Sequence, residues 1–129
     1  RRGEIVVFRH ERMPGRMLIK RVIGLPQEEL SIARGLVSVS GAPLVEDYIT
    51  ERSVEDHGPV YVPLGRVFVL GDNRNHSHDS TDASFGTVPL HGIEGKAFAV
   101  YWPLTNARVC RDPSYPEAAE AVTRARGAP

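Results

Sequence analysis

The polar stretch at residues 70–80, Leu-Gly-Asp-Asn-Arg-Asn-His-Ser-His-Asp-Ser, contains the side chains of this chain that are best suited to chemistry. It follows a β-branched and aromatic run at residues 65–69, which predicts a buried strand. The stretch offers carboxylates, amides, a guanidinium, imidazoles and hydroxyls. Asn, Asp, Ser and Gly are also the ordinary residues of solvated turns, so the composition of this stretch does not by itself establish a site.

A second stretch, Ile-Lys-Arg-Val-Ile-Gly-Leu-Pro at residues 19–26, places a lysine among aliphatic residues. In a strand, the period of two puts Leu18, Lys20 and Val22 on one face and Arg21 on the other. A lysine is a general base only when its amine is neutral, so the reference pKa of about 10.4 must fall towards the working pH. Desolvation by apolar neighbours lowers the pKa of an amine in this way. The alternative is a lysine that extends its ammonium group from an edge strand into water.

Four side chains near the end of the first stretch, His76, His78, Asp79 and Asp82, could suggest a metal site. The calcium-loop pattern fails, because no glycine or terminal glutamate falls at the required spacing. Two histidines two residues apart on a loop are more often solvated than metal-bound. A histidine-based triad has little support either, because no serine lies in a Gly-x-Ser-x-Gly turn. We therefore predict no metal site.

Together, the two stretches resemble signature segments of the type I (leader) signal peptidases, which are Ser/Lys proteases of the bacterial membrane. The lysine segment is similar to the family's Lys-Arg-x-x-Gly-Leu-Pro, which makes Lys20 the expected general base. The polar stretch is similar to Gly-Asp-Asn-Arg-x-x-Ser-x-Asp-Ser-Arg. The residues that match it one by one are Gly71, Asp72, Asn73, Arg74, Ser77, Asp79 and Ser80. The resemblance implies that Ser77 hydrogen-bonds Lys20 and orients it, and that both border a groove lined by apolar side chains.

The resemblance implies a structural role for the remaining matched residues of the loop. We expect Asp72 and Asp79 to hold the loop against the lysine strand by facing Arg21 or Arg74, because a carboxylate very close to a lysine base would keep the amine charged. The sequence departs from the family pattern at Thr81, where the family usually has arginine. Asp79 must therefore find another partner or face solvent.

For substrate, the resemblance implies the extended segment of a secreted pre-protein before its cleavage site, with small residues at the first and third positions before the scissile bond. Such a peptide can pair with a strand edge, and the matching positions here are Met17, Leu18 and Ile19. A serine would attack the carbonyl while Lys20 takes its proton, and water would then hydrolyse the acyl-enzyme. The resemblance implies no metal or organic cofactor. It places the domain on the extracytoplasmic face of the bacterial cytoplasmic membrane.

The family's nucleophile lies in a Ser-Met-x-Pro segment before the first strand. None of the eight serines of this chain is followed by methionine, so the nucleophile segment is absent from these residues. We therefore expect the chain alone not to cleave a signal peptide. Two alternatives remain, an autoprotease of the SOS-repressor type, which the Gly-Asp-Asn-Arg loop disfavours, and a catalytically inactive peptide-binding module.

The elements that must position these residues are strands. Frequent β-branched residues with 12 Gly and 10 Pro among 129 residues favour a mostly-β domain. The predicted strands are residues 4–9, 17–23, 30–33, 36–39, 65–69 and 95–103, and residues 60–63 lead into the strand at 65–69. The strands at 30–33 and 36–39 form a predicted hairpin around Arg34 and Gly35. The resemblance further implies that these strands form coiled antiparallel sheets, of the type shared by signal peptidases and SOS-repressor proteases.

We expect the catalytic domain at residues 1–112, with a surface excursion at about 43–58 anchored by Tyr48 and Ile49. The tail at 113–129 is expected to be partly helical, because residues 116–126 have Glu early and Arg late. No apolar run approaches the roughly 18 residues of a membrane helix, and the single cysteine, Cys110, allows no internal disulfide. Lys+Arg 16 against Asp+Glu 16 gives no indication of a nucleic-acid partner.

Overall fold

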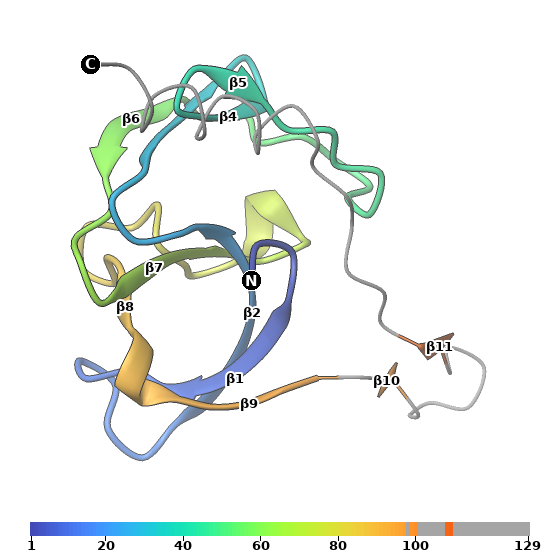
Figure 1. Cartoon of the computed structure of the whole chain (residues 1–129). Helices are drawn as coiled ribbons and strands as arrows, with labels where there is room; N and C mark the ends of the chain where they lie inside the picture. The colour runs from blue at the N-terminus through green and yellow to red at the C-terminus, as the bar shows by residue number, and fades with distance from the viewer. Residues whose placement is uncertain (98, 101–107, 110–129) are drawn as a thin grey trace.

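Two antiparallel sheets make up the computed structural model, which describes residues 1–97, 99–100 and 108–109 (Figure 1). The five-stranded sheet has the order β8 (Val88–Pro89), β7 (Arg66–Leu70), β2 (Met17–Gly24), β1 (Ile5–Arg9) and β9 (Ile93–Lys96). The four-stranded sheet has the order β5 (Ala42–Pro43), β4 (Leu36–Val39), β3 (Glu29–Ala33) and β6 (His57–Tyr61). A separate pair joins β10 (Ala99–Val100) to β11 (Arg108–Val109), and two 3-10 turns are η1 (Arg74–His76) and η2 (Leu90–Gly92). The expected mostly-β fold with antiparallel sheets is confirmed.

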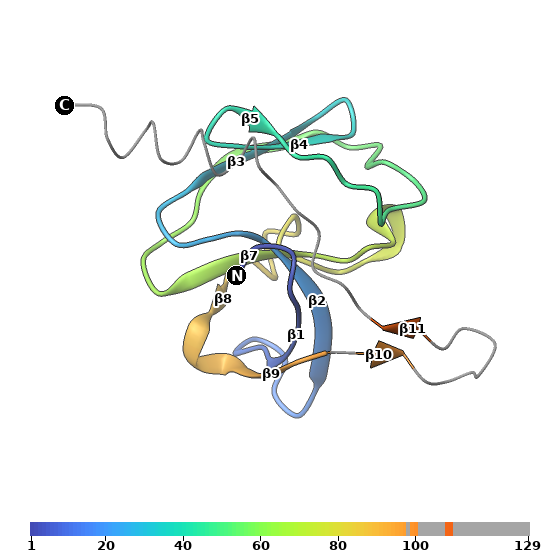
Figure 2. The same ribbon diagram turned by 45° about the vertical axis from the view of Figure 1, so that its right-hand side comes forward.

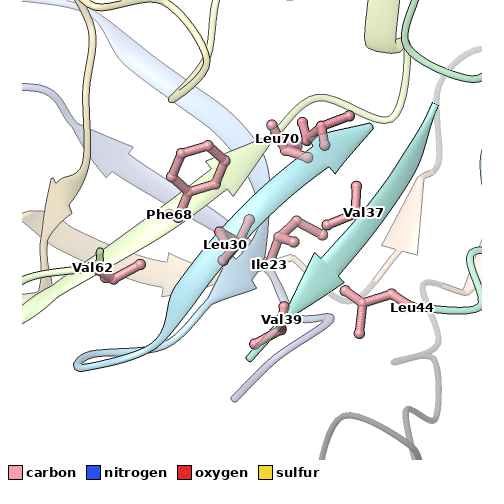
Figure 3. Packing of buried hydrophobic residues seen from close by; sticks show 9 residues of the cluster. Ile23, Leu30, Val37, Val39, Leu44, Val62, Phe68 and Leu70 are labelled. Atoms are coloured by element: carbon pink, nitrogen blue, oxygen red, sulfur yellow. The ribbon is translucent and has the colours of Figure 1, made fainter. Parts of the chain in front are cut away.

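The two faces of β2 and β7 contribute to two separate apolar cores. The first core lies between the sheets and contains Ile23, Leu30, Ile32, Val37, Val39, Leu44, Val62, Phe68 and Leu70 (Figure 3). The second core contains Val6, Phe8, Val22, Val67, Val69, Phe85 and Val88. The five-stranded sheet curves, with this second core on its concave face. The four-stranded sheet lies against the opposite face of the five-stranded sheet (Figure 2). Alternate residues of β2 therefore face different surroundings, as the period of a strand requires.

The pairing of β2 changes along its length, and this change leaves part of its edge open. Its first half pairs with β1, with Lys20 opposite Val6 and Met17 opposite Arg9. The strand pairing with β7 begins only at Arg21. On the side away from β1, the backbone from Met17 to Lys20 therefore has no strand partner among the described residues. An unpaired strand edge of this kind can accept an extended peptide.

Two predicted segments differ from the observed strands. Residues 60–63, expected to lead into the central strand, contain the end of a separate strand, because β6 begins at His57 and includes Gly58 and Pro59. Gly-Pro is typical of a turn, but β6 is the outer strand of its sheet, where the missing N–H of a proline is tolerated. The strand predicted at 95–103 is observed as β9 and β10, and residues 98 and 101–103 lie outside the described part of the chain.

The 43–58 segment is mostly irregular, as expected, and connects β5 to β6. Tyr48 packs against the first core, and Ile49 is half-buried. The C-terminal helix expected at 116–126, with Cys110 and the 113–129 tail, falls outside the described residues. No helix within the described ranges has the length and apolar character needed to cross a membrane.

Candidate active site

A hydrogen bond joins the two stretches singled out above. The Nζ atom of Lys20 donates to Oγ of Ser77 over 2.9 Å. Lys20 comes from β2 and Ser77 follows directly after η1, so the fold brings together two residues that are far apart in the sequence. Both side chains are half-buried. Leu18 and Val22, the strand neighbours on the face of Lys20, contribute to the second core or pack against it. The contact expected from the resemblance is therefore present.

Gly71 makes room for this contact. It follows the last residue of β7 and is buried. A Cβ atom placed on Gly71 would collide with both Cβ and Oγ of Ser77. The serine can therefore lie against the backbone beside Lys20 only because residue 71 has no side chain.

Arg21 fixes the start of the polar loop (residues 71–80) to β2. Its Nε and Nη2 atoms donate to the two carboxylate oxygens of Asp72 over 2.8 and 2.7 Å, and its Nη1 donates to the carbonyl of Gly3 over 2.8 Å. The guanidinium lies over the ring of Tyr48, 4.0 Å from its centre. Paired donors of this geometry form the stronger class of charged hydrogen bond. The carboxylate of Asp72 is thus bound by an arginine on the strand that carries Lys20.

Asp79 and Ser80 close the polar loop onto β7. Asp79 is buried, and its Oδ2 accepts a hydrogen bond from the Gly71 amide over 2.9 Å. Its Oδ1 accepts from the amide and the hydroxyl of Thr81 over 3.1 and 2.8 Å. The expectation that Asp79 faces Arg21 or Arg74 is therefore wrong, because its partners are two backbone amides and the hydroxyl of Thr81, which stands where the family usually has arginine. Ser80 Oγ accepts from the Val69 amide over 2.9 Å.

Comparison with known proteins decides the family. The sequence model of the family described as "Signal peptidase, peptidase S26" matches residues 1–102. The chain belongs to the signal peptidase S26 family. Among curated relatives of this family, "Probable signal peptidase I-2" of Synechocystis is 39% identical over 99% of this chain and 60% of its own length. "Signal peptidase I" of Leptolyngbya laminosa is 41% identical over 81% of this chain and 54% of its own length. The chain therefore spans somewhat more than half of these relatives.

The fold of the S26 family is also found in a solved structure. The crystal structure of a signal peptidase I from Enterococcus faecalis matches with a TM-score of 0.66 and 32% identity, over 74% of this chain and 94% of that one. A plant relative, "Thylakoidal processing peptidase 1, chloroplastic" of Arabidopsis thaliana, is 36% identical over 67% of this chain and 25% of its own length.

Met17, Leu18 and Ile19, the residues expected to bind substrate, lie on the open edge of β2. Met17 is 49% exposed and Ile19 is 60% exposed. Leu18 points to the other face of the strand, where it packs against the second core. Met17 and Ile19 therefore expose their apolar side chains on the face of β2 opposite to that of Lys20 and Leu18, and only the backbone edge is shared with Lys20.

The cavity that borders Ser77 differs from the apolar groove expected for the S26 site. It has a volume of about 400 Å³ and lies between the 43–58 segment and the polar loop. Its lining is Ser53, Val54, Glu55, Asp56, His57, Arg74, Asn75, Ser77, Thr81 and Asp82. This lining is mainly polar and acidic, so the expectation of an apolar lining is wrong for this cavity. Val54 is the one aliphatic side chain in this lining.

Sequence reasoning missed Glu46. The residue lies in the 43–58 segment, and its carboxylate accepts hydrogen bonds from Nη1 and Nη2 of Arg74 over 2.8 and 2.6 Å. Both side chains are almost fully buried. Burial disfavours the charged guanidinium, but the hydrogen bonds and the charge of Glu46 outweigh it, so the pKa of Arg74 is raised above its ordinary value. A single glutamate in an irregular segment has no pattern that would identify its partner.

The histidines of the polar loop lie at the surface. His76 is exposed and its Nδ1 is 3.3 Å from Oδ1 of the exposed Asn73. His78 Nε2 lies 3.1 Å from Asp82 Oδ2 and 3.3 Å from Ser84 Oγ, so both contacts use one ring nitrogen. A catalytic triad uses the two ring nitrogens separately. The described residues also contain no group of three or more His, Cys, Asp or Glu side chains arranged for a metal ion.

Proposed function

We propose that this S26 domain is the catalytic domain of a type I signal peptidase and that Lys20 is its general base. The observation that carries the proposal is the hydrogen bond of 2.9 Å between Lys20 Nζ and Ser77 Oγ, within the two segments that resemble the family signatures. The direction of this hydrogen bond matters. A neutral amine that donates one N–H to Ser77 retains its lone pair for the proton of a nucleophile.

In the proposed reaction, a serine hydroxyl attacks the carbonyl carbon of the scissile peptide bond while Lys20 takes its proton. The amine then returns a proton to the leaving nitrogen, and an acyl-enzyme forms. Water attacks the acyl-enzyme with Lys20 again as base, which releases the signal peptide and frees the serine. Ser77 holds the amine in one orientation throughout, because its Oγ accepts from Nζ.

The proposed nucleophile is the serine of a Ser-Met-x-Pro segment, which these residues do not contain. A second candidate is Ser77 itself, because its Oγ already lies 2.9 Å from the amine. The first assignment is favoured because Ser77 matches the family's orienting serine in the Gly-Asp-Asn-Arg loop and is pressed against Gly71.

The proposed substrate is the signal peptide of a secreted pre-protein, bound in extended form along the open edge of β2 at Met17, Leu18 and Ile19. The location that the resemblance to type I signal peptidases implies is the bacterial cytoplasmic membrane, with the domain on its extracytoplasmic face. The relative named as a thylakoidal peptidase extends the choice to thylakoid membranes.

A cleavage assay with mass spectrometry of the products tests this proposal. A pre-protein is incubated with the 129-residue chain, and with a version preceded by a membrane helix and a Ser-Met-x-Pro segment. The extended protein should release a mature protein whose new N-terminus follows a small residue, and the shorter chain should release none. Cleavage by the shorter chain that is abolished in Ser77→Ala would instead assign the nucleophile to Ser77.

A further inference from the structure

The 3-10 turn η1, which leads directly to Ser77, is held from outside by the 43–58 segment. We propose that Glu46 and Tyr48 in this segment are positioning residues of the Lys20–Ser77 pair. The inference rests on the proposed function, because it assigns these two residues a role in the catalysis proposed for the pair. It concerns residues outside both signature stretches.

The first contact is the ion pair between Glu46 and Arg74, the first residue of η1. The two side chains are 4% and 1% exposed, and two hydrogen bonds of 2.8 and 2.6 Å join them in a fork. The same guanidinium donates through Nε to the carbonyl of Gly71 over 3.1 Å. Arg74 therefore ties the 43–58 segment to both the start of the polar loop and the turn before Ser77. A fork of this geometry fixes orientation as well as distance.

The second contact passes through Tyr48. Its hydroxyl donates to Oε1 of Glu46 over 2.6 Å, and its ring lies under the guanidinium of Arg21 at 4.0 Å. Arg21 is in turn bound to Asp72 by two hydrogen bonds. Tyr48 thus connects the Arg21–Asp72 ion pair with the Glu46–Arg74 ion pair. The start of the polar loop, from Asp72 to Arg74, is therefore held at both ends.

A third contact acts on the next residue of η1. Asn75 accepts a hydrogen bond from the Val54 amide over 3.0 Å and donates through Nδ2 to the Arg52 carbonyl over 3.1 Å. The 43–58 segment therefore binds two successive residues of the turn, and Ser77 follows two residues later. Because η1 is a single turn, its orientation depends on such external contacts rather than on its own hydrogen bonds.

The test uses the extended protein described above and two variants. Tyr48→Phe removes only the hydroxyl and keeps the ring under Arg21. The double variant Glu46→Leu/Arg74→Met replaces the buried ion pair by apolar side chains, a change that proteins often tolerate without loss of stability. Tyr61→Phe is the matched control, because Tyr61 is 59% exposed and lies on β6.

The expected result is a fall of kcat by about tenfold or more in the double variant and of about threefold in Tyr48→Phe, with little change in KM, because misplacement of catalytic groups acts on the chemical step. A readout independent of activity is the NMR spectrum of lysine side chains. Lys20 and Lys96 are the only lysines of the chain. The signal of Lys20 should shift in both variants, the signal of Lys96 should not, and Tyr61→Phe should leave both unchanged.

The inference is overturned if both variants keep the wild-type kcat and the wild-type Lys20 signal. If the double variant does not fold, Tyr48→Phe alone decides, by the same two readouts. Lys20→Ala in the same assay separates this inference from the proposed function. A Lys20→Ala protein that still cleaves refutes the proposed function, whereas an inactive Lys20→Ala protein beside fully active Glu46 and Tyr48 variants refutes only the positioning role.

Discussion

A single methyl group added at Gly71 should disable the site. In Gly71→Ala the new Cβ would overlap with Cβ and Oγ of Ser77, and the backbone of Gly71 is held by its hydrogen bond to the buried Asp79. The serine must therefore move. A displacement of roughly 1 Å costs on the order of a hundredfold in rate when it affects catalytic groups. The overpacking should also lower the free energy of unfolding, by about 1–3 kcal/mol.

The assay compares kcat/KM for pre-protein cleavage, and the urea midpoint, between Gly71→Ala and Gly95→Ala. Gly95 is a suitable control because a Cβ there meets no atom within 4 Å. The control should keep its activity and lose little stability. If Gly71→Ala cleaved at a rate within threefold of the wild type, the position of Ser77 against this backbone would not matter for catalysis, and the reasoning would fail.

Three further predictions concern contacts of the polar loop and of the residues that follow it. Arg21→Lys keeps the charge but loses the fork and the stacked plane, so the free energy of unfolding should fall by about 1–3 kcal/mol; an unchanged urea midpoint would contradict this. Thr81→Val removes one hydroxyl donor from the buried carboxylate of Asp79 and should cost about 1 kcal/mol by the same measurement. The hydrogen bonds from Ser84 keep the pKa of Asp82 below its ordinary value, so their contribution to stability is present at neutral pH and is lost as the pH falls through this lowered pKa. In Ser84→Ala, NMR should find that the carboxyl of Asp82 titrates at a higher pH, and an unchanged titration would refute the assignment.

Much of the fold follows from the period of two in the sequence. The alternation in residues 17–23 predicts that Lys20 and Arg21 face opposite ways, and β2 sends its neighbouring side chains into two different cores. The hairpin predicted around Arg34 and Gly35 is also present, and both residues have the positive φ values that a tight connection requires.

The contacts that hold the polar loop in place, unlike the strands, could not be predicted from the period of the sequence. Glu46 and Arg74 are 28 residues apart, and an irregular segment has no period that would fix which way Glu46 faces. Asp79 is bound by backbone amides and the Thr81 hydroxyl rather than by an arginine, and the order of side chains does not reveal which backbone amides point at a buried carboxylate. Sequence patterns thus predict strands and their faces, whereas contacts between loops depend on the path of the backbone.

The role of Lys20 as general base is tested by measuring kcat/KM for pre-protein cleavage in Lys20→Met and Lys96→Met forms of the extended protein. Lys96 is the matched control, because it is the other lysine and lies on β9, where its amine is 3.4 Å from Glu4. If Lys20 is the general base, its replacement should lower kcat/KM by about 10²–10⁴, and replacement of Lys96 should change it by less than about threefold. A Lys20→Met protein that retains more than about a tenth of the wild-type kcat/KM would show that Lys20 is not the general base.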